Sequence, residues 1–420
     1  MQGRAGRGAV AALTAALVLA AGCTGDDDSA APERSTARSS APTTRASEPT
    51  TPPTRSTQPP DDPEPRSFTV ATSGDVLLHD GTWDTAEADA ARRGQPGLDF
   101  APMFADLRPA VGSVDLAVCH LETPLAEPAG PYASYPVFSA PPQVVRGLLD
   151  TGYDVCSTAS NHSVDTGAEG LVRTLRTLDR VGMAHFGTAL TRKDSRTPYV
   201  TDVEGVEVAL LNYTYGTNGI PVPSDMPWSV PLIDPQQIVD DAARARRDGA
   251  EAVLVGLHFG TEYSTAPDAY QLDVVDRITR SPDIDLVYGH HAHVPQPFDK
   301  VHGTWVAFGL GNFIAQQETT IPDTYRGITA RFTFTEQQSG GFEVSDVAFL
   351  PTMITPYVTG DPRMRVLDAA AALRDPATPA ALRPSLRLTV SEVTAAAESR
   401  GAQRLGLHLW RSWLTGSRRE

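Results

Sequence analysis

The sequence predicts an α/β fold in which a mixed sheet, or two packed sheets, is flanked by helices. From Phe68 onward, apolar runs of strand length alternate with segments of helical spacing, which is the pattern of layered α/β proteins. After Gly327 the strand-length runs continue without helices between them. A mixed sheet accommodates that change better than the purely parallel sheet of a dinucleotide-binding domain.

The expected elements follow in chain order. Strands are expected at residues 68–73, 113–119, 155–159, 199–202, 206–213, 252–258, 286–290, 304–308, 328–335 and 342–350. A helix over 141–149 closes at Gly152, a typical C-cap residue. Another begins at Asp234-Pro235, an N-cap followed by a first-turn proline, and runs to Gly249. Residues 165–178 form a further helix, and helical spacing in 385–414 predicts a C-terminal helical extension within 361–420.

Residues 1–23 have the pattern of an export signal. Arg4 and Arg7 precede an apolar stretch, residues 9–19, that is too short for a stop-transfer helix, and small residues stand before Cys23. The pattern resembles a bacterial lipoprotein signal, although Ala20 replaces the usual Leu. We expect cleavage before Cys23 and a lipid on its thiol, which would anchor the protein to the outer face of the cell membrane. Plain secretion and an uncleaved anchor are the alternatives.

We expect residues 24–66 to form a disordered tether between that anchor and a folded domain that comprises residues 67–360. Ser, Thr, Pro, Asp and Arg dominate the segment, so it cannot bury enough apolar surface to offset the entropy of ordering. The formal net charge of −16 argues against a nucleic-acid binder. An acidic substrate would therefore need a local cationic site, which bound metal could supply.

Two cysteines remain besides Cys23, each in an apolar run that should be a buried strand. Export permits oxidation, but we favour two buried thiols over a bridge between Cys119 and Cys156. The chain has no CxxC pair, which disfavours a Cys-ligated zinc or a thioredoxin-like redox site.

Polar side chains of metal-binding types follow five of the expected strands. Strand ends of an open α/β sheet converge on one crevice. The residues are Asp75, Glu122, Asn161, His162, His258, His290, His291 and His293. Singly, each could be a turn residue, a helix cap or a buried core histidine. Jointly they form an oxygen and nitrogen ligand set without sulfur, suited to Mn²⁺, Fe or Zn²⁺.

Strand alternation assigns the histidines at 290–293. Successive side chains of a strand point to opposite faces, so His291 and His293 would share one face as metal ligands and His290 would support them from the other. A bridging carboxylate would let two metal ions sit roughly 3.5–4 Å apart and activate water.

His162 is the candidate catalytic residue. It stands beside Asn161 but would face the substrate, where it could protonate a leaving group or bind an oxyanion. Its alternative role is only to hydrogen-bond a ligand. Asp165, which we group with His162 in catalysis, and Glu262 are expected to orient histidines, because ligating imidazoles usually donate their other N–H to a carboxylate or carbonyl.

Six sequence blocks resemble the CapA family of capsule and poly-γ-glutamate synthesis proteins. They are Gly74-Asp75-Val76, Leu121-Glu122-Thr123-Pro124, Asn161-His162-Ser163-Val164-Asp165-Thr166-Gly167, His258-Phe259-Gly260-Thr261-Glu262-Tyr263, Gly289-His290-His291-Ala292-His293 and Gly309-Leu310-Gly311-Asn312-Phe313. The family is similar to calcineurin-like metallophosphatases. The resemblance therefore implies that fold, two mixed β-sheets sandwiched between helices, and a dinuclear site.

The resemblance also implies roles for individual residues. The implied metal ligands are Asp75 on the first metal, Glu122 as the bridge, Asn161 and His258 on the second metal, and His291 and His293 divided between the two. His162 would match the family's substrate-side histidine. The first metallophosphatase block is normally Asp-x-His, but Leu77 stands at that histidine position and His79 is a poor substitute. His120 stands where the family usually has Asn, a change expected to affect only the surroundings of the ligands.

Two further segments could border the site. Asn312 could bind substrate, or its side chain could only hold a turn. Residues 214–231 form a long loop with Gly and Pro, placed to make a lip over the crevice. Tyr215 and Trp228 in this loop could contact a ligand or only pack the loop.

We therefore expect an extracytoplasmic, membrane-anchored protein with two divalent metal ions that hydrolyses phosphoester or amide-like bonds in capsule or poly-γ-glutamate-type polymer synthesis. The alternative is a noncatalytic accessory that binds an anionic envelope polymer and assists its export or anchoring. Either role could involve a membrane polymer synthase, and fold similarity does not separate them.

Overall fold

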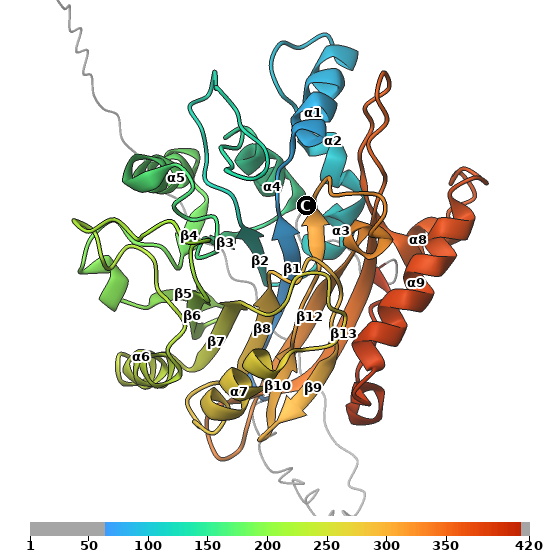
Figure 1. The fold of residues 1–420 in the computed structure, drawn as a ribbon. Coiled ribbons are helices and arrows are strands. Elements are labelled where there is room, and N and C mark those ends of the chain that lie inside the picture. Colours follow the sequence, from blue (N-terminus) through green and yellow to red (C-terminus); the bar gives the residue numbers. More distant parts are fainter. Residues whose placement is uncertain (1–63, 413–420) are drawn as a thin grey trace, which may run out of the picture. The chain divides into compact units, whose positions relative to one another are not determined.

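The computed structural model describes residues 64–412, which contain two β-sheets layered with helices (Figure 1). The expected export signal, Cys23 and nearly all of the tether lie outside these residues. Among the described helices, none combines the length and the apolar character needed to span a bilayer.

The larger sheet has nine strands. Its order is β14 (Val366–Asp368), β13 (Phe342–Ile354), β12 (Arg326–Glu336), β1 (Ser67–Val76), β2 (Leu116–Leu121), β3 (Val155–Ser157) and β4 (Ala184–Phe186), with β11 (Asn312–Ile314) also paired to β1 and β15 (His408–Leu409) to β13. The strands from β1 to β4 run parallel, whereas β12 is antiparallel to both of its neighbours.

The smaller sheet has six strands. Its order is β5 (Tyr199–Val203), β6 (Val206–Thr214), β7 (Ala252–His258), β8 (Leu286–His290), β10 (Thr304–Ala307) and β9 (Phe298–Val301). The four central strands are parallel and the two edge strands antiparallel. Both sheets are therefore mixed, and the predicted architecture is confirmed.

Three hydrophobic layers hold the sheets and helices together. Side chains of both sheets, including Val70 and Leu254, form the central layer. The other face of the nine-stranded sheet packs against α1 (Asp80–Arg92), α2 (Ala101–Phe104), α3 (Arg108–Val111), α4 (Val144–Thr151) and α5 (Gly167–Val181). The other face of the six-stranded sheet packs against α6 (Pro235–Arg247) and α7 (Ala269–Ile278). Burial of these apolar faces is the main term that favours the fold.

All ten predicted strands are present, with shifted ends in several cases. The strands that the sequence did not reveal, such as β4 and β11, have only two to four residues each, which is too short to display a period. The predicted N-cap is confirmed, since the Asp234 side chain accepts from the N–H groups of Gln236 and Gln237. Gly152 ends α4 with φ of 111°, as a C-cap glycine should.

Cys119 and Cys156 form a disulfide, so the prediction of two free thiols is wrong. The two residues lie opposite one another on the neighbouring parallel strands β2 and β3. The sequence places each cysteine in a strand but does not say that these strands are neighbours in this register.

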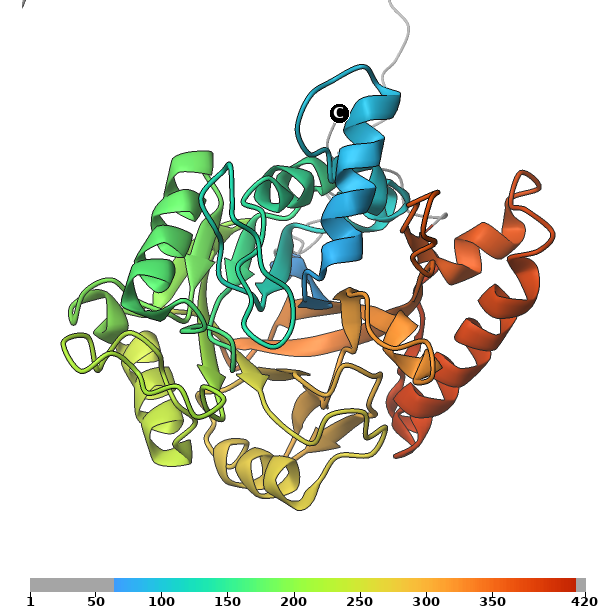
Figure 2. The same ribbon diagram turned by 45° about the horizontal axis from the view of Figure 1, so that its top comes forward.

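Residues 361–412, expected to form a helical extension, also supply strands to the larger sheet. They contain α8 (Ala369–Arg374) and α9 (Arg383–Glu398) as well as β14 and β15, which pair with β13. Figure 2 shows the two helices, in red, lying along that side of the sheet, where Val393 and Ala397 enter the central layer. This segment is therefore part of the same compact unit as the strands before it.

Candidate metal centre

The side chains predicted to bind metal gather at one edge of the two sheets, and all are buried. They are Asp75, Glu122, Asn161, His258, His291 and His293. Strand register explains the convergence, because Asp75 lies opposite His120 on β1 and β2, and His258 lies opposite His290 on β7 and β8. Parallel strands deliver their carboxyl ends to the same edge.

β1 continues through Asp75 instead of ending at Ser73, because β11 pairs with it there. The backbone N–H of Asp75 donates to the carbonyl of Gly311 at 2.9 Å. A Cβ atom on Gly74 would lie only 2.1 Å from that oxygen. Glycine is therefore needed at position 74 for the close approach of two backbones and not for a turn.

The histidine segment 290–293 holds the Asp75 carboxylate. Nδ1 of His290 lies 2.8 Å from Oδ1, the backbone N–H of His291 donates to Oδ2 at 3.1 Å, and Nδ1 of His293 lies 3.3 Å from Oδ2. Burial alone would raise the pKa of Asp75, but the hydrogen bonds and charges of His290 and His293 hold it well below its ordinary value. Asp75 is therefore an anion in this site.

His291 and His293 do not lie on a strand, so the alternation argument for their direction is wrong. β8 ends at His290, and both residues have left-handed backbone conformations, with φ of 87° and 59°. A turn, and not the period of a strand, brings both rings within reach of Glu122. Such conformations are uncommon for residues other than glycine and cluster at functional sites.

Glu122 is a buried carboxylate in the cluster that it forms with Asp75, His120, His258, His291 and His293. Its Oε1 lies 3.7 Å from Nε2 of His258 and 3.9 Å from Nε2 of His293, and neither carboxylate oxygen has a hydrogen-bond partner. Burial raises the pKa of Glu122 well above its ordinary value. A buried carboxylate without a partner is costly, and a bound cation would remove that cost.

The four histidines of the cluster differ in charge. Burial lowers the pKa of His120 and His258 well below the ordinary value and that of His291 to about 3, so these rings are neutral. Burial also opposes the charge on His293, but the Glu122 charge and the Asp75 hydrogen bond outweigh it and raise the pKa of His293 to about 9. A proton at His293 thus occupies the place that a metal ion would take.

The residues present fit a divalent metal centre. Two groups, Asp75 with His120 and His258, and Glu122 with His291 and His293, each offer three ligand atoms within 4.8 Å of one another. The donors are nitrogen and oxygen atoms without sulfur, which suits Mn²⁺, Fe or Zn²⁺. Nδ1 of His291, like the Glu122 oxygens, is buried without a partner. The cluster therefore offers donor atoms that no other protein group uses.

His162 lies beside the cluster, held by Asp165. Its Nδ1 is 2.7 Å from Oδ2 of Asp165, and the same oxygen accepts from the backbone N–H of Phe138 at 2.8 Å. The ring packs edge to face with Phe138 at 4.8 Å between centroids. The carboxylate fixes Nδ1 as the protonated nitrogen and leaves Nε2 for another partner.

The first block departs from the metallophosphatase pattern in structure as well as in sequence. The buried Leu77 packs with Phe138 and Ala315. Nδ1 of His79 lies 3.1 Å from the carbonyl of Leu77 and accepts from the N–H of Gln316 at 3.3 Å. His79 belongs to neither group of candidate ligands.

Two residues expected to support the site lie in different surroundings. Asn312 is buried, with Oδ1 3.0 Å from Nδ1 of His293 and Nδ2 donating to the carbonyl of Thr324 at 2.9 Å. It is thus placed to orient His293. Glu262 is exposed and hydrogen-bonds Tyr263, and its carboxylate acts on His293 only through its charge.

The 214–231 loop reaches the cluster, and its two aromatic residues have different surroundings. Tyr215 packs against the His291 ring, with 4.6 Å between centroids. Asn218 accepts from Nδ2 of Asn161 and from the Tyr215 hydroxyl, each at 3.2 Å. The Arg192 guanidinium lies over the Trp228 ring at 4.7 Å, so Trp228 packs the loop.

His120 and Asn218 contact the cluster although neither was among the predicted site residues. Strand alternation could have found His120, because residues 120 and 122 point to the same side of an extended chain. No sequence signal identifies Asn218, whose contact depends on the path of a long loop.

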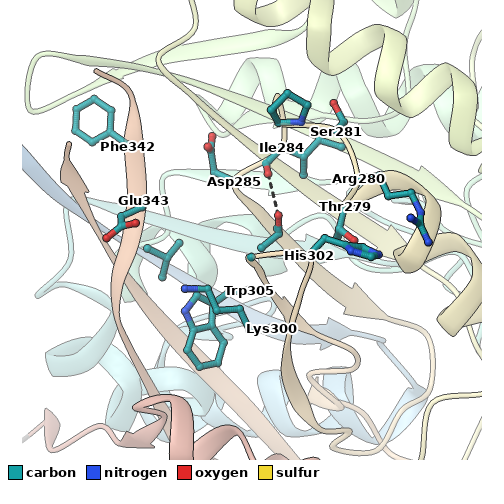
Figure 3. A pocket seen from close by; sticks show the side chains of 14 residues that line it. Thr279, Arg280, Ser281, Ile284, Asp285, Lys300, His302, Trp305, Phe342 and Glu343 are labelled. Carbon is teal, nitrogen blue, oxygen red and sulfur yellow. Dashed lines mark hydrogen bonds between the residues drawn. The ribbon is translucent and has the colours of Figure 1, made fainter. Parts of the chain in front are cut away.

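A separate pocket lies away from the candidate metal ligands. It has a volume of about 600 Å³ and is lined by residues that include Asp285, Lys300 and Trp305. Figure 3 shows Lys300 beside Trp305, with 6.0 Å from Nζ of Lys300 to the ring centroid of Trp305. The Thr304 hydroxyl donates to the carbonyl of Ile284 at 3.3 Å. This pocket lies where β8 and β10 begin, whereas the candidate metal ligands carried by the six-stranded sheet lie where β7 and β8 end.

Comparison with known proteins places the chain in a family. Residues 69–317 match the model of the bacterial capsule synthesis protein PGA_cap. The chain is 29% identical over 205 residues to "PGA biosynthesis protein CapA" of Bacillus subtilis, covering 48% of this chain and 53% of that protein. It is 26% identical over 237 residues to a "Probable polyglutamine synthesis accessory protein" of Mycobacterium tuberculosis, covering 53% of this chain and 59% of that protein.

The chain thus spans somewhat more than half the length of these two relatives. A similar solved structure is that of calcineurin-like phosphoesterase YfkN from Bacillus subtilis, with 13% identity, a TM-score of 0.43, and coverage of 79% of this chain and 99% of that chain. The family model matches more than half of the 420 residues. The chain therefore belongs to the bacterial capsule synthesis protein family PGA_cap.

Proposed function

We propose that this protein is a metal-dependent hydrolase of phosphoester or amide-like bonds that uses two divalent cations. The observation that supports this most directly is Glu122, a buried carboxylate whose oxygens have no hydrogen-bond partner and which lies near the neutral His258 and the protonated His293, in one cluster with the anionic Asp75. Buried carboxylates and imidazoles of this kind stabilise a bound cation, whereas they would destabilise an apolar core. Metal ions bound there would supply a water nucleophile at neutral pH and neutralise charge on the substrate.

The chain's own residues divide the remaining work. Asp75 and Glu122 would carry the negative charge that retains cations, and the 290–293 turn fixes the direction of the Asp75 carboxylate through the His291 N–H. His162 faces the substrate, and in its protonated form Nε2 donates to the leaving-group oxygen or nitrogen. Asp165 holds that ring in place through Nδ1 and stabilises its positive charge. Phe138 packs against His162 and limits the access of water to that side of the ring.

The proposed substrate belongs to the cell envelope. The family and the Bacillus subtilis relative connect this fold with capsule or poly-γ-glutamate synthesis. With a net charge of −16, the protein would rely on its bound cations to attract an anionic polymer or phosphoester. A lipid on Cys23 would place the site on the outer face of the cell membrane, within reach of a polymer synthase.

Purified full chain tests this proposal. We expect close to stoichiometric divalent metal by elemental analysis and hydrolysis of generic phosphomonoesters or phosphodiesters, or release of short chains from poly-γ-glutamate. Replacing His162 by Ala should lower kcat by about 10²–10⁴-fold while leaving the metal content unchanged. Full metal content without turnover on these substrates would contradict the enzymatic role.

A noncatalytic accessory role is the second candidate. It is favoured by the name of the Mycobacterium tuberculosis relative, which describes an accessory protein, and by Leu77 at a position where metallophosphatases have a ligand. In that case metal-loaded protein would bind poly-γ-glutamate tightly without cleaving it. Binding that disappears when metal is removed would place the polymer at the metal centre.

A further inference from the structure

A series of buried side chains, each hydrogen-bonded to the next, extends from Nδ1 of His258. The proposed hydrolytic mechanism does not use it. Nδ1 of His258 lies 3.0 Å from Nε2 of His120, and Nδ1 of His120 lies 2.8 Å from Oγ of Ser157. The Ser157 hydroxyl can also donate to the carbonyl of Cys119 at 3.3 Å. His258, His120 and Ser157 are each 0% exposed, so no water can replace a missing partner.

The position of His120 is fixed from several sides. Its ring stacks on that of His290, with 4.0 Å between centroids and 18° between planes. His120 and Ser157 lie opposite one another on β2 and β3, next to the disulfide that joins Cys119 to Cys156. His120 therefore cannot move away from His258 without disturbing both strands.

Nδ1 of His120 faces Ser157 and its Nε2 faces Nδ1 of His258, whereas Nε2 of His258 faces Asn161, itself a predicted ligand, so His258 is better placed than His120 to bind a cation. A neutral imidazole has one N–H and one lone pair, and the 3.0 Å contact between Nε2 of His120 and Nδ1 of His258 needs an N–H on one nitrogen and a lone pair on the other. Each hydrogen bond in this series therefore contains one proton. Donors and acceptors can be arranged in only two ways, and all the bonds reverse together.

Without a cation, Nε2 of His258 donates to Oδ1 of Asn161 at 2.8 Å. Nδ1 of His258 must then accept from His120, and His120 must accept from the Ser157 hydroxyl. A cation on the Nε2 lone pair requires the opposite direction. His258 then donates from Nδ1 to His120, His120 donates to Ser157, and Ser157 donates to the carbonyl of Cys119. Three protons are present in both arrangements, so none is gained or lost.

We propose that His120 is a positioning residue that accepts a hydrogen bond from the Nδ1–H of His258. It thereby selects the tautomer of His258 whose Nε2 is free to bind metal, and Ser157 and the Cys119 carbonyl complete the series of hydrogen bonds. The proposal rests on the metal centre of the proposed function. Loss of such a supporting hydrogen bond typically weakens metal affinity by about 10–100-fold.

Zinc titration of the full chain against a competing chelator tests this role. His120→Phe keeps a buried ring but cannot accept a proton, and should lower zinc affinity by about 10–100-fold. His120→Gln keeps an acceptor oxygen near the Nε2 position and should recover most of that loss. Ser157→Ala should weaken binding in the wild-type background but not in the His120→Phe background. Ser73→Ala removes a buried hydroxyl that bonds Tyr153 and Thr329, and serves as the matched control with unchanged affinity.

The His258→Ala background separates positioning from direct ligation, because its remaining ligands should still bind zinc weakly in a titration even though the metal is lost on gel filtration. If His120 acts only through His258, His120→Phe causes no further loss of zinc affinity in that background. A further loss would identify His120 as a ligand, and unchanged affinity of His120→Phe alone would also overturn the proposal. Should His120→Phe fail to fold, full affinity of Ser157→Ala would overturn it, and weakened binding would support it. A wild-type chain that binds no zinc would instead refute the metal centre itself.

Discussion

The backbone N–H of His291 donates to Oδ2 of Asp75 at 3.1 Å, joining the end of β8 to the end of β1 across 216 residues of sequence. The bond links the two sheets and pins a turn in which His291 has φ of 87°. The geometry of the proposed metal centre therefore depends on both sheets being folded.

Glu122→Gln should abolish tight metal binding while leaving the metal-free fold intact. The substitution replaces a buried carboxylate without partners by a neutral amide of similar shape, which lowers the cost of burial. We expect zinc affinity to fall by more than about 100-fold and the melting temperature of the metal-free protein not to decrease. Calorimetry measures the melting temperature, and competition with a chelator measures the zinc affinity. The exposed Glu169 provides a control, since Glu169→Gln should bind zinc normally.

His258→Ala and His291→Ala should each remove metal without unfolding the protein, because both rings lie at the loop-side ends of strands. The matched control is His79→Ala, a nearby buried histidine whose Nδ1 contacts the backbone of Leu77 and Gln316. Elemental analysis after gel filtration measures the metal content of each variant. Equal metal in wild type and both cluster variants would show that the ligands were assigned wrongly.

Metal affinity should increase between about pH 6.5 and 9. The pKa of His293 is raised to about 9 without metal, so a proton competes for this ligand below that pH and is released when metal binds. The stability that protonated His293 contributes to the metal-free fold is fully present below its unfolded pKa of about 6.5 and is lost as pH rises through 9. Zinc titrations at several pH values, with proton release measured in two buffers, test the sign. Affinity that falls over this range would refute it.

Gly74→Ala should destabilise the protein by at least about 1–3 kcal/mol, because the added Cβ meets the Gly311 carbonyl at 2.1 Å and the backbone must shift. The shift would also loosen the Asp75 N–H bond to Gly311, so metal affinity should fall with stability. Gly216→Ala is the control, since a Cβ there meets nothing within 4 Å. Urea denaturation compares the two variants, and equal midpoints would contradict the role of the β1–β11 contact.

Replacing Cys119 and Cys156 together by Ala should lower the free energy of unfolding by about 2–4 kcal/mol, since the bridge closes a loop with a sequence separation of 37. Reduction of the wild-type protein should lower its stability toward that of the double variant, and the same reductant should not change the variant. Denaturation with and without reductant provides the comparison. Equal stability of oxidised wild type and the double variant would mean that the bridge does not contribute.

Much of the candidate site follows from local sequence alone. Gly74-Asp75, Glu122, Asn161-His162, His258 and the 290–293 histidines each stand at or just beyond an apolar run, and strand ends of α/β proteins meet at one edge. This was sufficient to predict that their side chains gather there. It also sufficed for Asp234 as an N-cap, because capping depends on residues only two or three positions apart.

Contacts between distant segments could not be predicted in the same way. Pairing of Cys119 with Cys156 required β2 and β3 to be neighbours in one register. The directions of His291 and His293 came from a left-handed turn that Asp75 stabilises from another strand, and the partners of His120 lie on β3 and β7. The sequence by itself determined the chemical types of the ligands and the strands that carry them, because those depend on local pattern. Only the tertiary structure decided which atoms face one another, because register, turns and burial depend on packing between the sheets.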